Sequence, residues 1–402
     1  MTVSTDLAYA ARRSGDIRLI GSVSLAHCIS HFYMLVLPPL FIAIQNEYGV
    51  SYTELGLAFT LFNGVSALLQ TQAGFLVDRS GARLILAGGL LIEAAAFVIA
   101  ASFHSYWLLI GMFALMGVGN TVFHPADYSL LSHRVSPARM SHAYSMHGFA
   151  GMLGSAAAPA AVLVMSASFG WRGAFFGTAI LGTIAAMIVL FTIDDAPQDT
   201  PVPHEVKRAR SDRALLMSPP ILVNFIFFLL IALASFGLQS FFVVGLRALH
   251  GTDAAASNAA LSGNLLMSAI GVLIGGWLAS RITQHRLLAS IGLSASAIAA
   301  LVMANFDLSA GLLFALMSAA GVLYGMVMPS RDMIVREVTP PGAFGRVFGF
   351  VTNGFNIAGI VAPLLFGALL DHGLAREFFY MTAAFTVAAI VAVACVPRQR
   401  AY

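Results

Sequence analysis

Long apolar runs separated by short polar segments dominate the sequence. A run of about 20 apolar residues is long enough for an α-helix to cross the ~30 Å hydrocarbon layer of a bilayer. The pattern predicts twelve such helices, at residues 17–44, 53–77, 84–103, 106–132, 140–166, 172–193, 219–246, 257–280, 286–305, 310–336, 343–370 and 377–396. The sequence therefore predicts an all-α protein that crosses a membrane many times.

The composition excludes a soluble protein. Of the 402 residues, 59% are hydrophobic and only 10% are charged, and a soluble chain could not bury that much apolar surface. The short polar N-terminal segment lacks an apolar core followed by a small-residue cleavage site, so we expect no cleaved signal peptide. Cys28 and Cys395 lie in apolar spans of different halves, which favours neither a disulfide nor a cysteine metal site.

The basic residues predict the orientation in the membrane. With both termini in the cytoplasm, only Arg172, Arg247 and Arg376 among the 21 Lys and Arg residues fall on the outer side. Inner loops rich in Lys and Arg are typical of membrane proteins, so we expect both termini in the cytoplasm and a multi-pass protein of a bacterial inner membrane. The net charge of +3 needs no nucleic-acid partner, because the basic loops face the anionic leaflet of the bilayer.

A polar segment at residues 194–218, rich in Asp, Pro and Arg, interrupts the apolar pattern near the middle of the chain. Such a composition breaks helices and marks a boundary. The sequence predicts an N-terminal six-helix domain at residues 1–193, a cytoplasmic linker at 194–218 and a C-terminal six-helix domain at 219–402.

Residues 74–83 read Gly-Phe-Leu-Val-Asp-Arg-Ser-Gly-Ala-Arg and lie between two apolar runs. Charges are costly in hydrocarbon, so this segment must lie at a membrane surface. Gly74 allows a close approach of helices, and Gly81 allows a tight turn.

A weaker copy of this segment occurs in the second half. Residues 275–281 repeat it at a constant offset, so that Gly74 matches Gly276 and Arg79 matches Arg281. Two halves of about 200 residues that match in the same orientation indicate a duplicated six-helix unit.

The spacing G-x-x-x-D-R-x-G-x-R in residues 74–83 resembles the signature loop between the second and third helices of the major facilitator superfamily of transporters. This resemblance covers the whole chain. It implies two six-helix bundles with pseudo-two-fold symmetry around a central cavity, and transport by alternating access. Asp78, Arg79 and Arg83 could form a charge cluster that locks two helices together in one transport state.

A narrower resemblance concerns the first half of the chain. Residues 24–27, 66–70 and 122–125, together with a Gly-rich fifth span, resemble the fosmidomycin-resistance branch of bacterial exporters. This resemblance implies an antiporter that works in efflux.

Polar residues inside predicted spans are the candidates for the transport site, since they are costly in a membrane. In the fourth span, Asn120, His124 and Asp127 share one helix face, and Tyr324 and Arg331 occupy matching positions in the second half. The superfamily resemblance implies that this polar stripe lies near the substrate path. An alternative is that Asp127 and Arg331 lie near the cytoplasmic helix ends, where such side chains reach the surface.

The first span carries His27 and His31, which lie four residues apart on one helix face. Two imidazoles at this spacing can bind a metal, share a proton or hydrogen-bond a substrate. A metal site needs further ligands, which His124, Asp127 and His147 would supply if they converge. We expect substrate or proton contact and no metal site.

Glu93 lies in the middle of the third span, among Leu and Ala residues. Burial favours the neutral carboxyl group there. Glu93 is therefore either a neutral packing group or a proton carrier, and the sequence leaves both open.

These features predict secondary active transport. The sequence lacks the phosphate loop G-x-x-x-x-G-K-[ST], which excludes the common class of ATP-driven pump. We expect no catalytic residues, no cofactor and no enzyme activity. Because a carboxylate beside an imidazole exchanges protons readily, Asp127 and His124 favour proton coupling over sodium coupling.

Arg331, supported by Tyr324 and the histidines, favours a small anionic substrate such as a carboxylate or phosphonate. The sequence predicts a monomeric, proton-coupled exporter of such a compound. Three alternatives remain open: an importer of organic anions, a metal-ion transporter and a receptor that does not transport.

Overall fold

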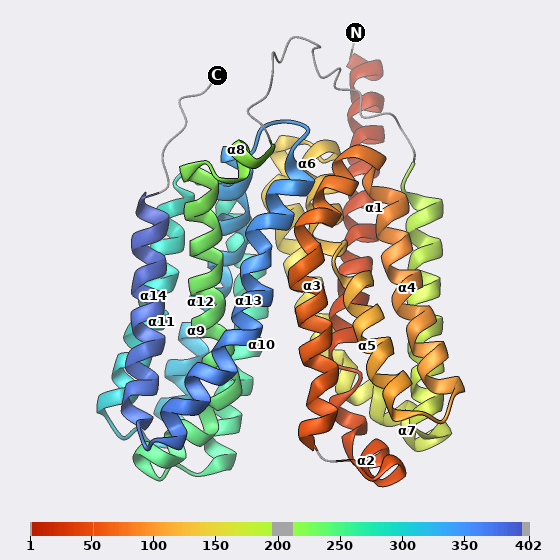
Figure 1. Cartoon of the computed structure of the whole chain (residues 1–402). Helices are drawn as coiled ribbons and strands as arrows, with labels where there is room; N and C mark the ends of the chain where they lie inside the picture. Colours follow the sequence, from red (N-terminus) through yellow and green to blue (C-terminus); the bar gives the residue numbers. More distant parts are fainter. Residues whose placement is uncertain (1, 51, 195–211, 396–402) are drawn as a thin grey trace. The chain divides into compact units, whose positions relative to one another are not determined.

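The computed structural model describes residues 2–50, 52–194 and 212–395 (Figure 1). Their regular secondary structure is helical throughout, which confirms the prediction of an all-α protein. These residues form two compact units. The first contains residues up to 194 together with 340–349, and the second contains residues 212–339 and 350–395.

The first unit begins at the N-terminus and ends before the linker. Its helices, with the short 3₁₀ turns η1 and η2, are α1 (Thr2–Met34), η1 (Pro38–Leu40), α2 (Phe41–Tyr48), α3 (Tyr52–Ser80), α4 (Ala82–Ser102), α5 (Tyr106–Asn120), α6 (Phe123–Arg134), η2 (Pro137–Arg139) and α7 (Met140–Thr192). The predicted linker at 194–218 lies largely outside the described residues.

The second half of the chain repeats this helical pattern. Its helices are α8 (Asp212–Leu216), α9 (Pro219–His250), α10 (Ala254–Ala279), α11 (His285–Asn305), α12 (Ala310–Val338), α13 (Phe344–Asp371) and α14 (Ala375–Cys395). The first residues of α13, up to Gly349, belong to the first unit.

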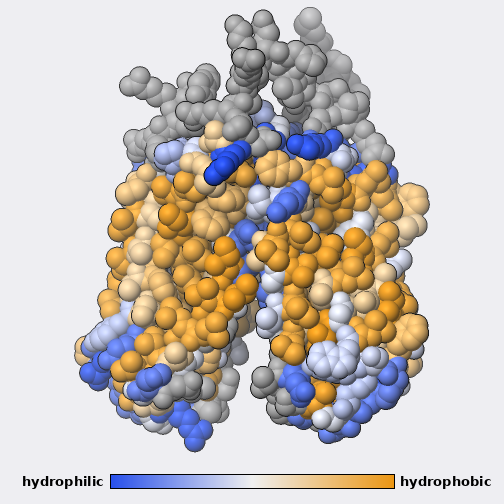
Figure 2. Space-filling model, in the orientation of Figure 1, coloured by the Kyte–Doolittle hydropathy of each residue, from blue (hydrophilic) through white to orange (hydrophobic). Residues whose placement is uncertain are grey.

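The helices have the length and composition of membrane spans. Within the part of the chain that the structure describes, ten segments are long and apolar enough to cross a bilayer. The two further predicted spans, 53–77 and 140–166, are helical as well. Figure 2 shows apolar residues along the sides of the helices and hydrophilic residues gathered at their ends, the distribution expected of membrane-spanning helices.

Proline divides two of the predicted spans in ways that the apolar pattern did not show, and glycine separates two others where the pattern predicted a gap. The first span was predicted to reach residue 44, but α1 ends at Met34, ahead of Pro38 and Pro39. The fourth predicted span is two helices, because Pro125 cannot donate a backbone hydrogen bond and its ring crowds the carbonyl four residues before it. The fifth and sixth spans meet at Gly170, whose φ of 71° is not helical.

In the second unit, α10 and α12 pack with their backbones close together. A Cβ atom added to Gly325 would lie 2.0 Å from the carbonyl oxygen of Ser268, and one on Gly321 would lie 2.3 Å from that of Asn264. Only glycine fits at such positions. Small residues at helix contacts replace the hydrophobic driving force that is missing inside a membrane.

A charged cluster ties α2 to the turn at Gly170 in the first unit. Arg172 donates two hydrogen bonds to the Glu47 carboxylate, at 2.5 and 2.7 Å, and the Trp171 indole donates a third at 2.6 Å. The exposed His104 lies 2.8 Å from the same carboxylate. The hydrogen bonds from Arg172 hold the pKa of Glu47 below its usual value.

We expect Glu47→Gln to lower the stability of the protein at neutral pH by about 2 kcal/mol, because charge-assisted hydrogen bonds are lost. The pKa of Glu47 is lower in the folded than in the unfolded state. Its contribution is therefore fully present above the unfolded value, about 4.3, and is lost as the pH falls through the folded value.

Thermal unfolding should be measured from pH 7 down to acid pH. The difference in melting temperature between wild type and Glu47→Gln should shrink as the pH falls. His104→Gln, which alters an exposed neighbour, is the control and should change little. If the difference in melting temperature does not change with pH, ionised Glu47 does not stabilise this end of the unit.

Candidate functional site

Asp127 on α6 is fully buried and lies at the centre of a group of imidazoles in the first unit. The Nε2 atom of His147 donates to Asp127 Oδ2 over 3.0 Å, and His27 Nδ1 lies 3.2 Å from the same oxygen. The other carboxylate oxygen, Oδ1, is buried and has no hydrogen-bond partner among the residues that the structure describes. One oxygen is therefore hydrogen-bonded to His147 and close to His27, while the other lacks a partner among the described residues.

Two more imidazoles complete what we call the His–Asp cluster: His27, His31, His124, Asp127 and His147. The ring of His27 stacks on that of His147 with centroids 3.6 Å apart and an interplanar angle of 22°. The rings of His31 and His124 lie 4.5 and 5.3 Å from His27. The structure thus brings four of the predicted site residues together and adds His147, which the sequence suggested only as a possible further ligand.

Glycines on α7 allow α1 to approach closely enough for this contact. A Cβ atom on Gly151 would lie 2.8 Å from the Cδ2 atom of His27, and one on Gly154 would lie 2.0 Å from the Cys28 carbonyl oxygen. The Gly-rich sequence of the predicted fifth span therefore positions His27 against His147. The small residues are visible in the sequence, but the sequence does not show which helix packs against them.

Asn120 lies apart from the cluster, beside Glu93 of α4. Glu93 is fully buried, and a Cβ atom on the neighbouring Gly119 would lie 2.7 Å from its Cγ atom. The Glu93 carboxyl group is therefore packed tightly between α4 and α5. This tight packing agrees with the interpretation of Glu93 as a packing group, while its use as a proton carrier stays open.

The predicted gating loop is built around Asp78 at the end of α3. Its carboxylate accepts hydrogen bonds from the backbone N–H groups of Gly345 and Arg346, at 2.8 and 3.0 Å, and from the Arg346 side chain at 2.9 Å. Gly345 and Arg346 lie in the first turn of α13, where N–H groups lack helical partners and attract negative charge. Sequence reasoning missed Arg346 because it is 268 positions away.

The other predicted residues of this loop have separate roles. A Cβ atom on Gly74 would lie 2.5 Å from the Gly345 carbonyl oxygen, so glycine is required for this contact. Gly81 has a φ of 85°, as expected for a tight turn. Arg83 donates to the carbonyl oxygen of Leu190, and Arg79 is exposed.

In the second unit, Tyr324 and Arg331 lie on α12, each with a nearby partner. The hydroxyl of Tyr324 is 2.6 Å from that of Ser235 on α9. Arg331 is only 5% exposed, and its Nε atom donates to Asp332 Oδ1 over 2.8 Å. Adjacent residues point about 100° apart on a helix, so helix periodicity does not predict this contact.

Aromatic rings cover the Arg331 guanidinium group. Its carbon lies 4.5 Å from the ring centre of Phe228 on α9 and 5.3 Å from that of Phe355 on α13. A cation between aromatic faces is stabilised by the ring electrons and kept in one orientation. Arg331 is thus a buried, oriented cation beside the Asp332 carboxylate.

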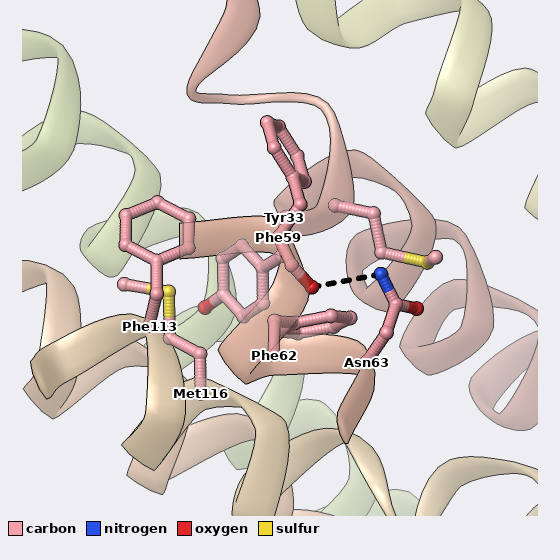
Figure 3. A pocket seen from close by; sticks show the side chains of 7 residues that line it. Tyr33, Phe59, Phe62, Asn63, Phe113 and Met116 are labelled. Carbon is pink, nitrogen blue, oxygen red and sulfur yellow. Dashed lines mark hydrogen bonds between the residues drawn. The ribbon is translucent and has the colours of Figure 1, made fainter. Parts of the chain in front are cut away.

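A small cavity lies between α1, α3 and α5 of the first unit. Its volume is about 30 Å³, and Figure 3 shows the side chains of Tyr33, Phe59, Phe62, Asn63, Phe113 and Met116 around it. The Asn63 amide donates to the Phe59 carbonyl oxygen over 3.0 Å. The space suits one or two water molecules and is too small for an organic substrate in this conformation.

Comparison with known proteins assigns these features to a family. Residues 23–247 and 225–401 match the model of the Major Facilitator Superfamily. The fosmidomycin resistance protein of Escherichia coli is 24% identical, covering 91% of this chain and 89% of its own. A protein of Cupriavidus necator named "Probable sulfoacetate transporter" is 23% identical, covering 88% of this chain and 87% of its own.

A solved structure has the same fold. The crystal structure of the Escherichia coli fucose:proton symporter matches 95% of this chain and 98% of its own with a TM-score of 0.75, at 14% identity.

Proposed function

The chain belongs to the Major Facilitator Superfamily, and from this premise we propose that it exports a small organic anion in exchange for protons, by alternating access. The family consists of membrane transporters of small molecules, so the chain is a multi-pass membrane protein and not an enzyme. The relatives described above include proteins from bacteria, which supports a place in the bacterial inner membrane.

The buried Asp127 carboxylate, held between the imidazoles of His27 and His147, is the observation that carries proton coupling. A carboxylate and an imidazole that share a hydrogen bond can take up one proton with a small change in geometry. An intramembrane carboxylate is retained at a cost, which is a reason to assign it a function. Because Asp127, His27 and His147 are buried, they are suited to exchanging a proton only when the protein opens to one side.

Arg331 supports an anionic substrate. A guanidinium group presents several N–H donors in a plane that matches carboxylate and similar oxyanion groups. Phe228 and Phe355 orient this cation, and Asp332 would exchange its contact for the substrate as the anion arrives. The relative named for sulfoacetate, an organic anion, agrees with this substrate class.

The name of the fosmidomycin resistance protein supports export, because resistance to a compound is commonly achieved by removing it from the cell.

We further propose that the protein acts as a monomer with both termini in the cytoplasm. Its functional domains are those expected from the sequence, 1–193 and 219–402, joined by the linker at 194–218.

Transport into inside-out membrane vesicles tests this function. We expect protons accumulated inside these vesicles to flow out of the lumen and drive uptake of radiolabelled organic anions, since the vesicles expose the cytoplasmic face. A sodium gradient without a pH gradient should give no uptake. Uptake only in right-side-out vesicles would indicate an importer, and binding without flux under every gradient would indicate a receptor.

A thermal-shift screen of purified protein narrows the substrate class. We expect carboxylates, sulfonates or phosphonates to raise the melting temperature, and Arg331→Gln to remove this effect by weakening binding about tenfold or more, because a charged hydrogen-bond donor contributes about 1.5–3 kcal/mol. Arg281→Gln, which removes a cation resting on Trp277 at an exposed position, is the matched control. Stabilisation that survives in Arg331→Gln would contradict the role of Arg331.

A further inference from the structure

Three residues of the His–Asp cluster place possible metal ligands close together, an arrangement that proton coupling does not require. One ring nitrogen of His27, one ring nitrogen of His147 and one carboxylate oxygen of Asp127 all lie within 4.8 Å of one another. They come from three helices, α1, α6 and α7, and all three residues are buried. Three possible ligand atoms that lie close together and are buried form the basis of a metal site.

The distances agree with coordination of a small cation. In a tetrahedral zinc site, metal–ligand bonds of about 2.0–2.1 Å place the ligand atoms roughly 3.4 Å apart. The separations from Asp127 Oδ2 are 3.2 Å to His27 Nδ1 and 3.0 Å to His147 Nε2, a few tenths of an ångström shorter. Small rotations of the two rings would open a position for an ion between these atoms.

A second observation points to a ligand at the same place. Asp127 Oδ1 is buried and has no hydrogen-bond partner among the described residues, although a carboxylate oxygen inside a protein normally has one. A cation held by Asp127 would satisfy this oxygen through bidentate contact or through a bound water molecule. The rings of His31 and His124 lie close enough to supply a fourth ligand after a change of rotamer.

The donor set selects the kind of ion. Two imidazole nitrogens and one carboxylate oxygen suit Zn²⁺ and neighbouring transition metals, whereas Mg²⁺ and Ca²⁺ prefer oxygen ligands alone. We propose that His27, Asp127 and His147 bind one divalent transition-metal ion, with three protein ligands and an exchangeable fourth position. This site does not depend on the substrate or direction of transport proposed above, but a bound ion would occupy the same Asp127 carboxylate that the proposed proton coupling uses.

Binding of Co²⁺ and Zn²⁺ to the purified full-length protein in detergent tests the site without any transport. Co²⁺ should bind at one ion per chain, give the visible absorption of a four-coordinate complex, and be displaced by Zn²⁺ but not by Mg²⁺. Asp127→Asn and His147→Gln should each weaken binding by about 100-fold, since loss of groups that only support a ligand costs 10–100-fold.

His142→Gln is the matched control, because His142 is an exposed histidine on the same helix as His147. Its binding should equal that of the wild type. Failure to find saturable binding at one ion per chain, or affinity unchanged in Asp127→Asn and His147→Gln, would overturn the site.

A measurement on the wild-type protein avoids any folding defect of the variants. X-ray absorption of the zinc complex should show two imidazole ligands and light-atom ligands near 2.0–2.1 Å. A shell with sulfur at about 2.3 Å would place the ion at a cysteine instead, and a shell of oxygen alone would assign it to surface carboxylates or detergent; either result would overturn the proposal.

Discussion

Asp127→Asn should reduce proton-driven transport to the background of empty liposomes while exchange of substrate across the membrane continues. The variant keeps the size of the side chain and one oxygen that can accept from His27 or His147. It removes the charge that a proton neutralises. Gradient-driven accumulation requires that step, whereas exchange of one substrate molecule for another does not.

The measurement compares three assays in the same liposomes: uptake driven by a pH gradient, exchange of labelled for unlabelled substrate, and proton movement reported by an internal dye. Asp307→Asn, which changes an exposed carboxylate, is the control and should behave as wild type. His147→Gln should resemble Asp127→Asn in part, because it removes one of the two rings that face the carboxylate.

If Asp127→Asn transports protons and substrate in the same ratio as wild type, Asp127 takes no part in energy coupling. Glu93, which is also fully buried, would then be the candidate proton carrier. If Asp127→Asn loses both substrate exchange and gradient-driven accumulation, Asp127 is needed for substrate binding or for folding. The thermal-shift profile of the variant would separate those two cases.

The sequence predicted the membership of the His–Asp cluster better than its contacts. Helix periodicity placed His27 and His31 on one face and His124 with Asp127 on another, because residues three or four apart share a face. Convergence of these faces depends on how closely α1 and α7 approach, which Gly151 and Gly154 decide. A single sequence contains those glycines but does not say which helix packs against them.

Ionic contacts were the least predictable part of the structure. Asp78 was expected to act with nearby arginines, but the structure gives it Arg346, beyond the reach of any local pattern. Arg331 bonds to its direct neighbour Asp332, although adjacent residues point about 100° apart on a helix. The long, flexible arginine side chain bends back because Phe228 supplies a favourable surface for its cation.

Asp78→Asn should loosen residues 342–349 from the end of α3. The change removes the negative charge that accepts from the N–H groups of Gly345 and Arg346 and from the Arg346 guanidinium group. Hydrogen bonds to a charged group contribute about 1.5–3 kcal/mol, and a carboxylate at a helix N-terminus gains further from the aligned peptide dipoles. A loss of about 2 kcal/mol corresponds to roughly 30-fold faster local opening.

Hydrogen–deuterium exchange followed by mass spectrometry measures this opening directly. Backbone amides at the start of α13 should exchange about 30-fold faster in Asp78→Asn, by the same conversion of free energy to rate. Amides in the middle of α4, which has no contact with this carboxylate in the described hydrogen bonds, should be unchanged. Gly74→Val should have the same local effect by steric means, because its side chain would meet the backbone of Gly345 and Arg346.

The exposed pair of Arg18 and Asp194 provides the matched control. It has the same 2.9 Å separation as the contact between Arg346 and Asp78, but its side chains are 55% and 74% exposed rather than 19% and 4%. Water screens exposed pairs strongly, so Asp194→Asn should leave exchange at α13 unchanged. If Asp78→Asn behaves like Asp194→Asn, the packing around Gly74 rather than the charge of Asp78 holds this segment in place.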